Sequence, residues 1–248
     1  MTTALVRYRC DGPVATITMD DGKANVLSPA MLAELNAALD RALTNDAVVV
    51  LTGRPGIFSA GFDLSVLQRG GSDAAAMVRT GFETAERLLS FRTPVVVACS
   101  GHAVAMGVFL LLAADYRIGA EGAFTIAANE VAIGLAMPRA AVEILRQRLA
   151  PAYFHRAVAL AEAFDPDTAV PAGLLDRVVH RDELLAVAHE LARHFGELDL
   201  PAHQTSKLRA RASALTALRN AIVADAAELR GRPAPSRPAV RPVRDAVL

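Results

Sequence analysis

Hydrophobic and polar positions at the start of the chain predict a strand, a turn and a helix in succession. Residues 14–19 mix β-branched and apolar side chains and end in an Asp-Asp-Gly sequence, which predicts a strand running into a turn. Ser28 then offers a helix N-cap, and Pro29 is a proline at the first helical position. Four leucines follow at helical spacing: Leu32, Leu35, Leu39 and Leu43. We therefore expect a helix over about residues 29–44.

The same alternation of strand and helix continues to about residue 126. Apolar runs at 48–52 and 95–99 predict buried strands, and a helix with an apolar face around Phe82 and Leu88 precedes the second of them. The remaining elements expected in this part are an apolar helix over 106–114 and short strands at 116–118 and 124–126. A strand and helix repeated every few tens of residues indicate a layered α/β architecture.

Beyond about residue 139 the pattern becomes almost entirely helical. Residues 140–149 carry an apolar stripe, Asp182 is expected to cap a helix that reaches about residue 194, and residues 201–229 are alanine-rich with clustered charges. Residues 231–248 contain several prolines and arginines and almost no core-forming side chains, which predicts a mobile tail.

Composition and charge exclude several classes of protein. The 248 residues contain 26 basic and 26 acidic side chains, so no global attraction to nucleic acid or to an anionic membrane is expected. The two cysteines, Cys10 and Cys99, fit neither a disulfide framework nor a zinc site. No signal-peptide pattern begins the chain, and its longest apolar run is too short to cross a bilayer. We expect a cytoplasmic protein without metal, membrane or nucleic-acid partners.

Two turns of small residues suggest where chemistry takes place. Residues 58–63 read Phe-Ser-Ala-Gly-Phe-Asp, and residues 101–107 read Gly-His-Ala-Val-Ala-Met-Gly after an apolar strand and before an apolar helix. Turns of this kind can each aim a backbone N–H at one point in space. Two converging N–H groups form an oxyanion hole, which stabilises negative charge on a carbonyl oxygen.

With these turns the chain resembles the crotonase, or enoyl-CoA hydratase/isomerase, superfamily over roughly residues 5–230. The resemblance rests on four features in the family's order: the start at residues 21–28, the two turns, and the Asn-Glu-Val-Ala-Ile-Gly segment at 129–134. It implies a spiral of ββα repeats in an acyl-CoA-binding core, here residues 1–195. It further implies a helical region, here 196–230, that mediates assembly into a homotrimer or a dimer of trimers.

The resemblance also implies roles for individual residues in an enzyme of fatty-acid metabolism that stabilises a thioester enolate. The oxyanion hole would be formed by the backbone N–H groups of Phe62 and Met106. Coenzyme A, which is part of the substrate rather than a cofactor, would contact the Ala60 carbonyl and the basic side chains of Arg54 and Lys207. The acyl pocket would include Phe109 and Gly107.

The acid and base residues depart from the family's hydratases, which hold a water between two glutamates. One of these positions is Glu130, but the other is Phe109, whose ring can neither accept a proton nor orient water. A single carboxylate suffices to move a proton within one substrate, which favours a Δ3,Δ2-enoyl-CoA isomerase. An apolar wall at Phe109 should also raise the pKa of Glu130. The dienoyl-CoA isomerases need an aspartate where this chain has Pro138.

Two alternative interpretations of the acid and base residues remain. Glu130 alone could activate water in a trans-2-enoyl-CoA hydratase, or the chain could bind acyl-CoA without catalysis. Three neighbouring polar residues are given structural interpretations: Asp63 as a local hydrogen-bonding residue, His102 as a packed or turn histidine, and Asp115 as a residue that fixes a turn.

Overall fold

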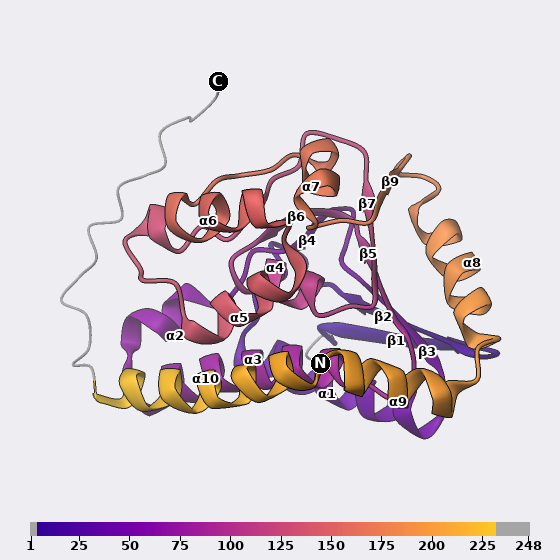
Figure 1. Cartoon of the computed structure of the whole chain (residues 1–248), viewed down its shortest axis with the longest axis horizontal. Coiled ribbons are helices and arrows are strands. Elements are labelled where there is room, and N and C mark those ends of the chain that lie inside the picture. Colours follow the sequence, from indigo (N-terminus) through magenta and orange to yellow (C-terminus); the bar gives the residue numbers. More distant parts are fainter. Residues whose placement is uncertain (1–3, 232–248) are drawn as a thin grey trace.

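The computed structural model describes residues 4–231, which form two β-sheets surrounded by helices (Figure 1). Residues 1–3 and 232–248 lie outside the described part of the chain. The predicted mobile tail therefore falls outside it as well, apart from Gly231, where the last helix ends.

The larger sheet has six strands in the order β1-β2-β3-β5-β7-β9. The first two strands pair antiparallel through a tight turn, and the other neighbours pair parallel. Every residue of β3 and β5 is buried, as expected for parallel strands covered on both faces. The strands are β1 (Val6–Asp11), β2 (Val14–Met19), β3 (Val48–Thr52), β5 (Val95–Cys99), β7 (Tyr116–Ala120) and β9 (Arg177–Val179).

The smaller sheet contains three parallel strands, β4 (Gly56–Ser59), β6 (Gly101–Val104) and β8 (Ile126–Ala127). Each follows directly after a strand of the larger sheet, and each is followed by helical structure. The chain thus passes three times from the larger sheet to the smaller sheet and then into a helix. This repeat confirms the predicted spiral of ββα units.

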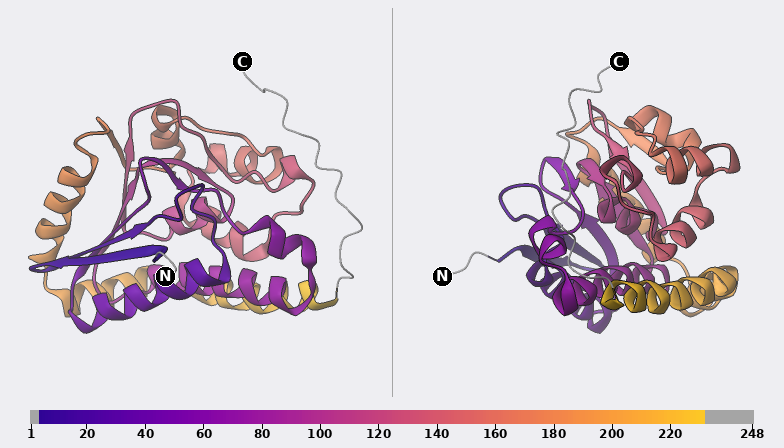
Figure 2. Two further views of the ribbon diagram at one scale, coloured as in Figure 1. Left: turned by 180° about the vertical axis from the view of Figure 1, so that it is seen from behind. Right: turned by 90° about the vertical axis from the view of Figure 1, so that its left-hand side faces the viewer.

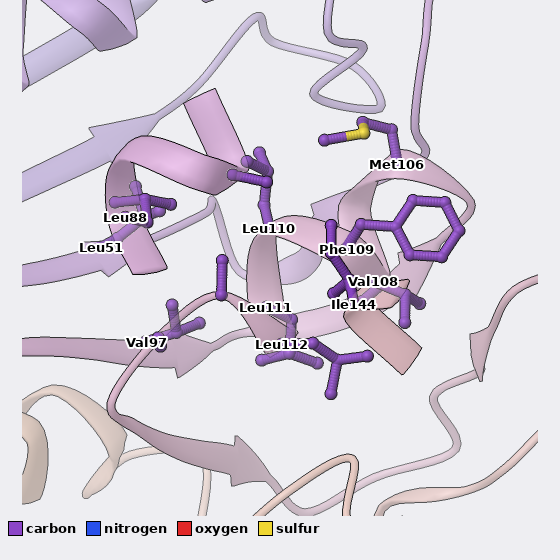
Figure 3. Packing of buried hydrophobic residues seen from close by; sticks show 14 of the residues in the cluster. Leu51, Leu88, Val97, Met106, Val108, Phe109, Leu110, Leu111, Leu112 and Ile144 are labelled. Carbon is purple, nitrogen blue, oxygen red and sulfur yellow. The ribbon is translucent and has the colours of Figure 1, made fainter. Parts of the chain in front are cut away.

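The helices between the strands bury the expected apolar faces. Helix α1 (Pro29–Thr44) begins as predicted, because the Ser28 hydroxyl accepts a hydrogen bond from the backbone of Met31 and proline follows the cap. Helices α2 (Leu64–Arg69) and α3 (Gly71–Leu89) come next. All seven residues of α4 (Met106–Leu112) are buried. Figure 3 shows its apolar side chains packed among Leu51, Leu88, Val97 and Ile144.

The C-terminal half is helical, but it packs back onto the sheets. Helix α8 covers the outer face of the larger sheet, at one end of the molecule in Figure 1. Helix α10 runs beside α3 and α5, as both views in Figure 2 allow the reader to follow, and its buried leucines join the main core. The helices are α5 (Arg139–Arg148), α6 (Pro151–Leu160), α7 (Pro166–Ala172), α8 (Leu184–Gly196), α9 (Leu200–Ala210) and α10 (Ala212–Gly231).

The structure corrects several details of the sequence prediction. Residues 201–229 are helical as predicted, but they are divided between two helices at Arg211, whose guanidinium reaches inward to the Leu89 carbonyl. Helix α8 is not capped by Asp182; its N-cap is Glu183, whose side chain makes no capping hydrogen bond. Strand β8 begins at residue 126 rather than 124. Four strands were not predicted: β1 is mostly exposed, β9 has only three residues, and β4 and β6 overlap the segments predicted as turns.

Candidate active site

The three strands of the smaller sheet bring three separate segments to one edge. Because β4, β6 and β8 are parallel, their carboxyl ends lie at the same edge, the usual position of ligand sites in parallel sheets. The first strand is followed by residues 60–62, the second by residues 105–106, and the third by residues 128–130. Both predicted small-residue turns and the Asn-Glu segment therefore meet in space.

The two turns touch at Gly61. A Cβ atom at this position would lie 2.8 Å from the Ala105 Cβ and 3.1 Å from the Met106 backbone nitrogen. Gly61 also has φ +86°, a conformation that favours glycine. Within residues 4–231, neither the N–H of Phe62 nor that of Met106 donates a hydrogen bond. Neither N–H therefore serves the fold itself; Phe62 is partly exposed, whereas Met106 is fully buried.

Hydrogen bonds and close packing hold the two turns in place. The Asn25 side chain donates to the carbonyl oxygens of Ile57 and Phe58, and the Ser59 hydroxyl donates to the Asn25 carbonyl. On the other side, a Cβ on Gly107 would lie 2.5 Å from the Ser59 carbonyl oxygen. Gly107 is thus required for the close approach of β4 and α4.

The second turn is strained where it leads into α4. Ala105 has φ +50° and ψ −126°, which is unfavourable for a residue with a Cβ. Its N–H donates to the Ala127 carbonyl at the end of β8, which helps to fix this conformation. The strain lies directly before the nitrogen of Met106, so it sets the direction of that N–H.

A cavity of about 360 Å³ opens beside these turns. Its walls include three phenylalanine rings, with Phe82 stacked on Phe109 at 5.8 Å and edge-on to Phe62 at 6.2 Å between ring centroids. Among the described residues that line it, Glu130 is the only ionisable one. The full lining is Ala60, Phe62, Leu64, Leu67, Gly70, Gly71, Ala74, Val78, Phe82, Ala105, Phe109, Asn129, Glu130, Ile133, Leu135, Ala136, Pro138 and Leu229.

Glu130 is buried in this cavity and is only 7% exposed. Burial raises its pKa to about 7, in the predicted direction, because the charged form loses hydration that few protein groups replace. Its Oε2 atom and the Oδ1 atom of Asn129 are buried without a hydrogen-bond partner in the described structure. Two adjacent unpartnered polar atoms in an apolar cavity indicate that a ligand or water completes their hydrogen bonding.

Of the other candidates implied by the resemblance, some line the cavity and others do not. Ala60 and Phe109 line the cavity, whereas Gly107 does not and serves packing instead. The side chain of Met106 is fully buried in the main core. Arg54 donates to the Lys23 carbonyl near the start of β4 and does not line the cavity.

Lys207 is the clearest departure from expectation. Its side chain is 3% exposed, and its Nζ lies 2.6 Å from Asp115 Oδ2 in an ion pair inside the fold. Burial lowers its pKa to about 8. Because this ammonium group is enclosed in the fold, it does not face an acyl-CoA. Lys207 therefore has a structural role rather than the expected contact with a phosphate group.

The three structural interpretations of polar residues are confirmed. Asp63 caps α2 by accepting a hydrogen bond from the Ser65 N–H at 2.8 Å. The Nδ1 atom of His102 accepts from the Thr125 N–H, and its ring packs edge-on against Phe124. Asp115 exchanges backbone and side-chain hydrogen bonds with the Val95 main chain.

Sequence reasoning missed other residues of the site. Phe82 was recognised only as part of a helix face, and Leu229 reaches the cavity wall from the far end of the chain. Gly81 in the middle of α3 offered a signal, because an isolated glycine inside a helix often marks a close approach. A Cβ there would lie 2.4 Å from the Phe62 ring.

Two further features bear on the site. No helix in the described part of the chain is long and apolar enough to cross a membrane. Within residues 4–231 there is also no group of three or more His, Cys, Asp or Glu side chains arranged to hold a metal ion.

Comparisons with known proteins agree with this geometry. A family model described as enoyl-CoA hydratase/isomerase matches residues 9–230. Carnitinyl-CoA dehydratase from Salmonella typhi is 30% identical over 190 residues, covering 74% of this chain and 71% of the relative. Among solved structures, an enoyl-CoA hydratase/isomerase family protein from Pseudomonas syringae is 45% identical with a TM-score of 0.89, covering 91% of this chain and 98% of the other.

A second similar structure is the apo form of an enoyl-CoA isomerase from Mycobacterium tuberculosis. It is 47% identical with a TM-score of 0.88 and covers 91% of this chain and 99% of the other. The family match spans nearly the whole described chain, and the fold agrees with both solved structures over 91% of this chain. This chain therefore belongs to the enoyl-CoA hydratase/isomerase family of the crotonase superfamily.

Proposed function

We propose that this enzyme converts 3-enoyl-CoA thioesters into 2-enoyl-CoA thioesters, with Glu130 as its single acid and base. The observation that carries the proposal is that Glu130 is the only ionisable side chain among the described cavity residues. A second carboxylate would be needed to hold and activate water as the two-glutamate hydratases do, and Phe109 stands in that position.

The proposed reaction moves one proton within the substrate. The ionised Glu130 removes a proton from C2 of the 3-enoyl thioester, and the electron pair passes into the carbonyl group to give a dienolate. The protonated Glu130 then returns the proton to C4 while the double bond forms between C2 and C3. No other reactant is consumed, and the carboxylate is regenerated.

Negative charge that develops on the thioester oxygen would be stabilised by the backbone. The N–H groups of Phe62 and Met106 have no acceptor within residues 4–231, and Gly61 allows their turns to approach. In this proposal they form an oxyanion hole. Each such donor typically contributes about 3 kcal/mol to transition-state stabilisation.

The surroundings of Glu130 suit a proton shuttle. A pKa of about 7 leaves a large fraction of the carboxyl group ionised near neutral pH while keeping it basic enough to take a weakly acidic proton. The rings of Phe82 and Phe109 would exclude water while the proton resides on Glu130. The similar Mycobacterium tuberculosis protein is called an enoyl-CoA isomerase with one structure and a probable enoyl-CoA hydratase with another, so its names favour neither chemistry.

Hydration of 2-enoyl-CoA is a second candidate, favoured by one observation. The unpartnered Oδ1 atom of Asn129, the residue before Glu130, offers a hydrogen-bond acceptor for a water molecule. An amide cannot accept a proton, however, so Glu130 would have to act alone as the base. We therefore rank hydration below isomerisation.

The test compares both reactions in the purified protein and its variants. We expect conversion of trans-3-hexenoyl-CoA to trans-2-hexenoyl-CoA, and a loss of about 10²–10⁴-fold in Glu130→Gln. A control variant is Glu83→Gln, at an exposed glutamate paired with Arg79 on α3. Full isomerase activity in Glu130→Gln would refute the proposal. If the wild type forms 3-hydroxyhexanoyl-CoA from trans-2-hexenoyl-CoA faster than it isomerises trans-3-hexenoyl-CoA, hydration is favoured instead.

Assembly is a separate proposal that rests on the resemblance. We expect a homotrimer or a dimer of trimers in which α9 and α10 contribute to subunit contacts. Light scattering on the purified chain tests this directly, and a monomer at micromolar concentration would contradict it.

A further inference from the structure

Three large apolar side chains line the cavity and are also exposed to solvent. They are Leu64, Ile133 and Leu135, with 57%, 42% and 46% of their surfaces accessible. We call these three residues the apolar rim. Large apolar side chains gathered at a cavity mouth mark a surface that a ligand covers.

The rim is linked rigidly to the reacting end of the cavity. The Glu130 carbonyl oxygen accepts hydrogen bonds from the N–H groups of Ile133 and Leu135, at 3.1 and 2.9 Å. The turn that holds the proposed base therefore also positions two of the three rim residues.

The third rim residue comes from another part of the chain, next to the C-terminal helix. Leu64 is the first residue of α2, and the cavity wall near the rim is completed by Leu229 of α10. Figure 1 shows α2 and the C-terminal end of α10 on the same side of the molecule. Apart from Glu130 and Asn129, the side chains of the described lining residues are apolar or absent. A path without charged groups thus leads from the base to the surface.

We propose that the apolar rim binds the distal methylenes of a long acyl chain, so that long-chain acyl-CoA thioesters are the preferred substrate class. This inference rests on the proposed function, since it assumes that the acyl group occupies the cavity. A short chain would be enclosed entirely and would leave the rim in water, whereas a longer chain continues from the cavity onto it.

The experiment measures the affinity of saturated acyl-CoA thioesters of increasing length, from four to sixteen carbons, by calorimetry below their micelle concentrations. Each enclosed methylene should lower Kd about fourfold. Once the chain reaches the rim, each further methylene should lower Kd about twofold, because one side of the chain stays in water.

Variants of the three rim residues distinguish the contribution of the apolar rim to acyl-CoA affinity from that of the cavity. Leu64→Ser, Ile133→Ser and Leu135→Ser should leave the Kd of short chains within about twofold and abolish the further gain for long chains. Two matched controls are Val131→Ser, 41% exposed on the same turn but outside the cavity lining, and Leu160→Ser, 74% exposed on α6. Both should retain the wild-type dependence on chain length.

Three results would overturn the inference. One is a wild-type Kd that stops falling as soon as the cavity is filled, and another is an equal loss of short-chain and long-chain affinity in the rim variants. The third is a change of oligomeric state in those variants, which would identify the rim as a subunit contact. Saturated thioesters do not isomerise, so the chain-length result is independent of whether Glu130→Gln abolishes isomerase activity.

Discussion

Gly61 and Met106 belong to different ββα units, yet a single added carbon on Gly61 would come within 3.1 Å of the Met106 nitrogen. This contact joins the ends of β4 and β6. It brings the Met106 nitrogen close to Gly61, whose neighbour Phe62 carries the other N–H proposed for the oxyanion hole. The proposed oxyanion hole depends on this approach.

Gly61→Ala should therefore impair catalysis more than stability. The new Cβ would collide with Ala105 and separate the two N–H groups, so we expect kcat to fall about 10²–10³-fold, as when one donor is lost. The conformational penalty of alanine at φ +86° adds about 1–2 kcal/mol of destabilisation. Steady-state kinetics and thermal unfolding measure the two effects.

Gly56→Ala provides the matched control for that variant. Gly56 has φ +87° at the start of β4, the strand that precedes Gly61, but a Cβ there would meet nothing within 4 Å. Its destabilisation should be limited to the same conformational penalty, and its kcat should be nearly unchanged. Equal losses of kcat in the two variants would show that backbone strain, not the distance between the turns, controls activity.

Glu130→Gln should stabilise the protein in a pH-dependent way. The native pKa of about 7 lies above the ordinary glutamate value of 4.5, so the native state binds more protons than the unfolded state between these pH values. The free energy of unfolding of the wild type therefore falls as pH rises through this window. We expect the variant to be more stable by at most about 3 kcal/mol at pH 8 and by less than about 1 kcal/mol at pH 5. Chemical denaturation at both pH values checks this, and a constant difference would argue against a buried, desolvated carboxyl group.

Gly81→Ala should reshape the cavity through Phe62. The added Cβ would lie 2.4 Å from the Phe62 ring, which is itself packed against Phe82, so the ring must move. Overpacking of this kind costs about 1–3 kcal/mol, against a gain of about 1 kcal/mol in helix propensity. We expect weaker binding of butyryl-CoA with a modest change in Tm. Gly196→Ala, whose nearest neighbour is 3.6 Å away, should alter neither binding nor stability by much.

The buried ion pair between Asp115 and Lys207 predicts a structural rather than a ligand-binding role for Lys207. Asp115 pairs with Lys207 and also with Arg211 at 2.9 Å, so Asp115→Asn leaves two enclosed cations without a carboxylate. We expect a loss of about 3–5 kcal/mol in the free energy of unfolding. Lys207→Met should change the Kd of coenzyme A thioesters by less than twofold; a tenfold weakening in the folded variant would restore the phosphate contact implied by the resemblance.

Local patterns in the sequence were sufficient for the elements that frame the site. The Ser28-Pro29 cap and leucine spacing predicted α1 to the residue, and the buried valine runs predicted β3 and β5. The two turns were recognisable as small-residue connections between apolar segments, and Glu130 was identified through the resemblance to the family. The apolar residue at position 109 also indicated that Glu130 is shielded from water, which desolvates its carboxyl group and raises its pKa.

Features that depend on distant packing could not be predicted. Leu229 reaches the cavity because α10 folds back onto α3 and α5, and nothing in its own neighbourhood indicates this. Lys207 was assigned to a ligand because its partner, Asp115, lies 92 residues earlier in the sequence. At the break between α9 and α10, Arg211 likewise contacts distant groups, Leu89 of α3 and Asp115 just before β7.

The most direct test of a single carboxylate follows the proton itself. A 3-enoyl-CoA carrying deuterium at C2 is converted in ordinary water, and the product is examined for deuterium at C4 by mass spectrometry and NMR. If Glu130 carries the proton from C2 to C4 while the acyl group fills the apolar cavity walled by Phe82 and Phe109, part of the deuterium should appear at C4 of the 2-enoyl-CoA product. A product formed at full rate with no deuterium at C4 above natural abundance would contradict a single enclosed carboxylate.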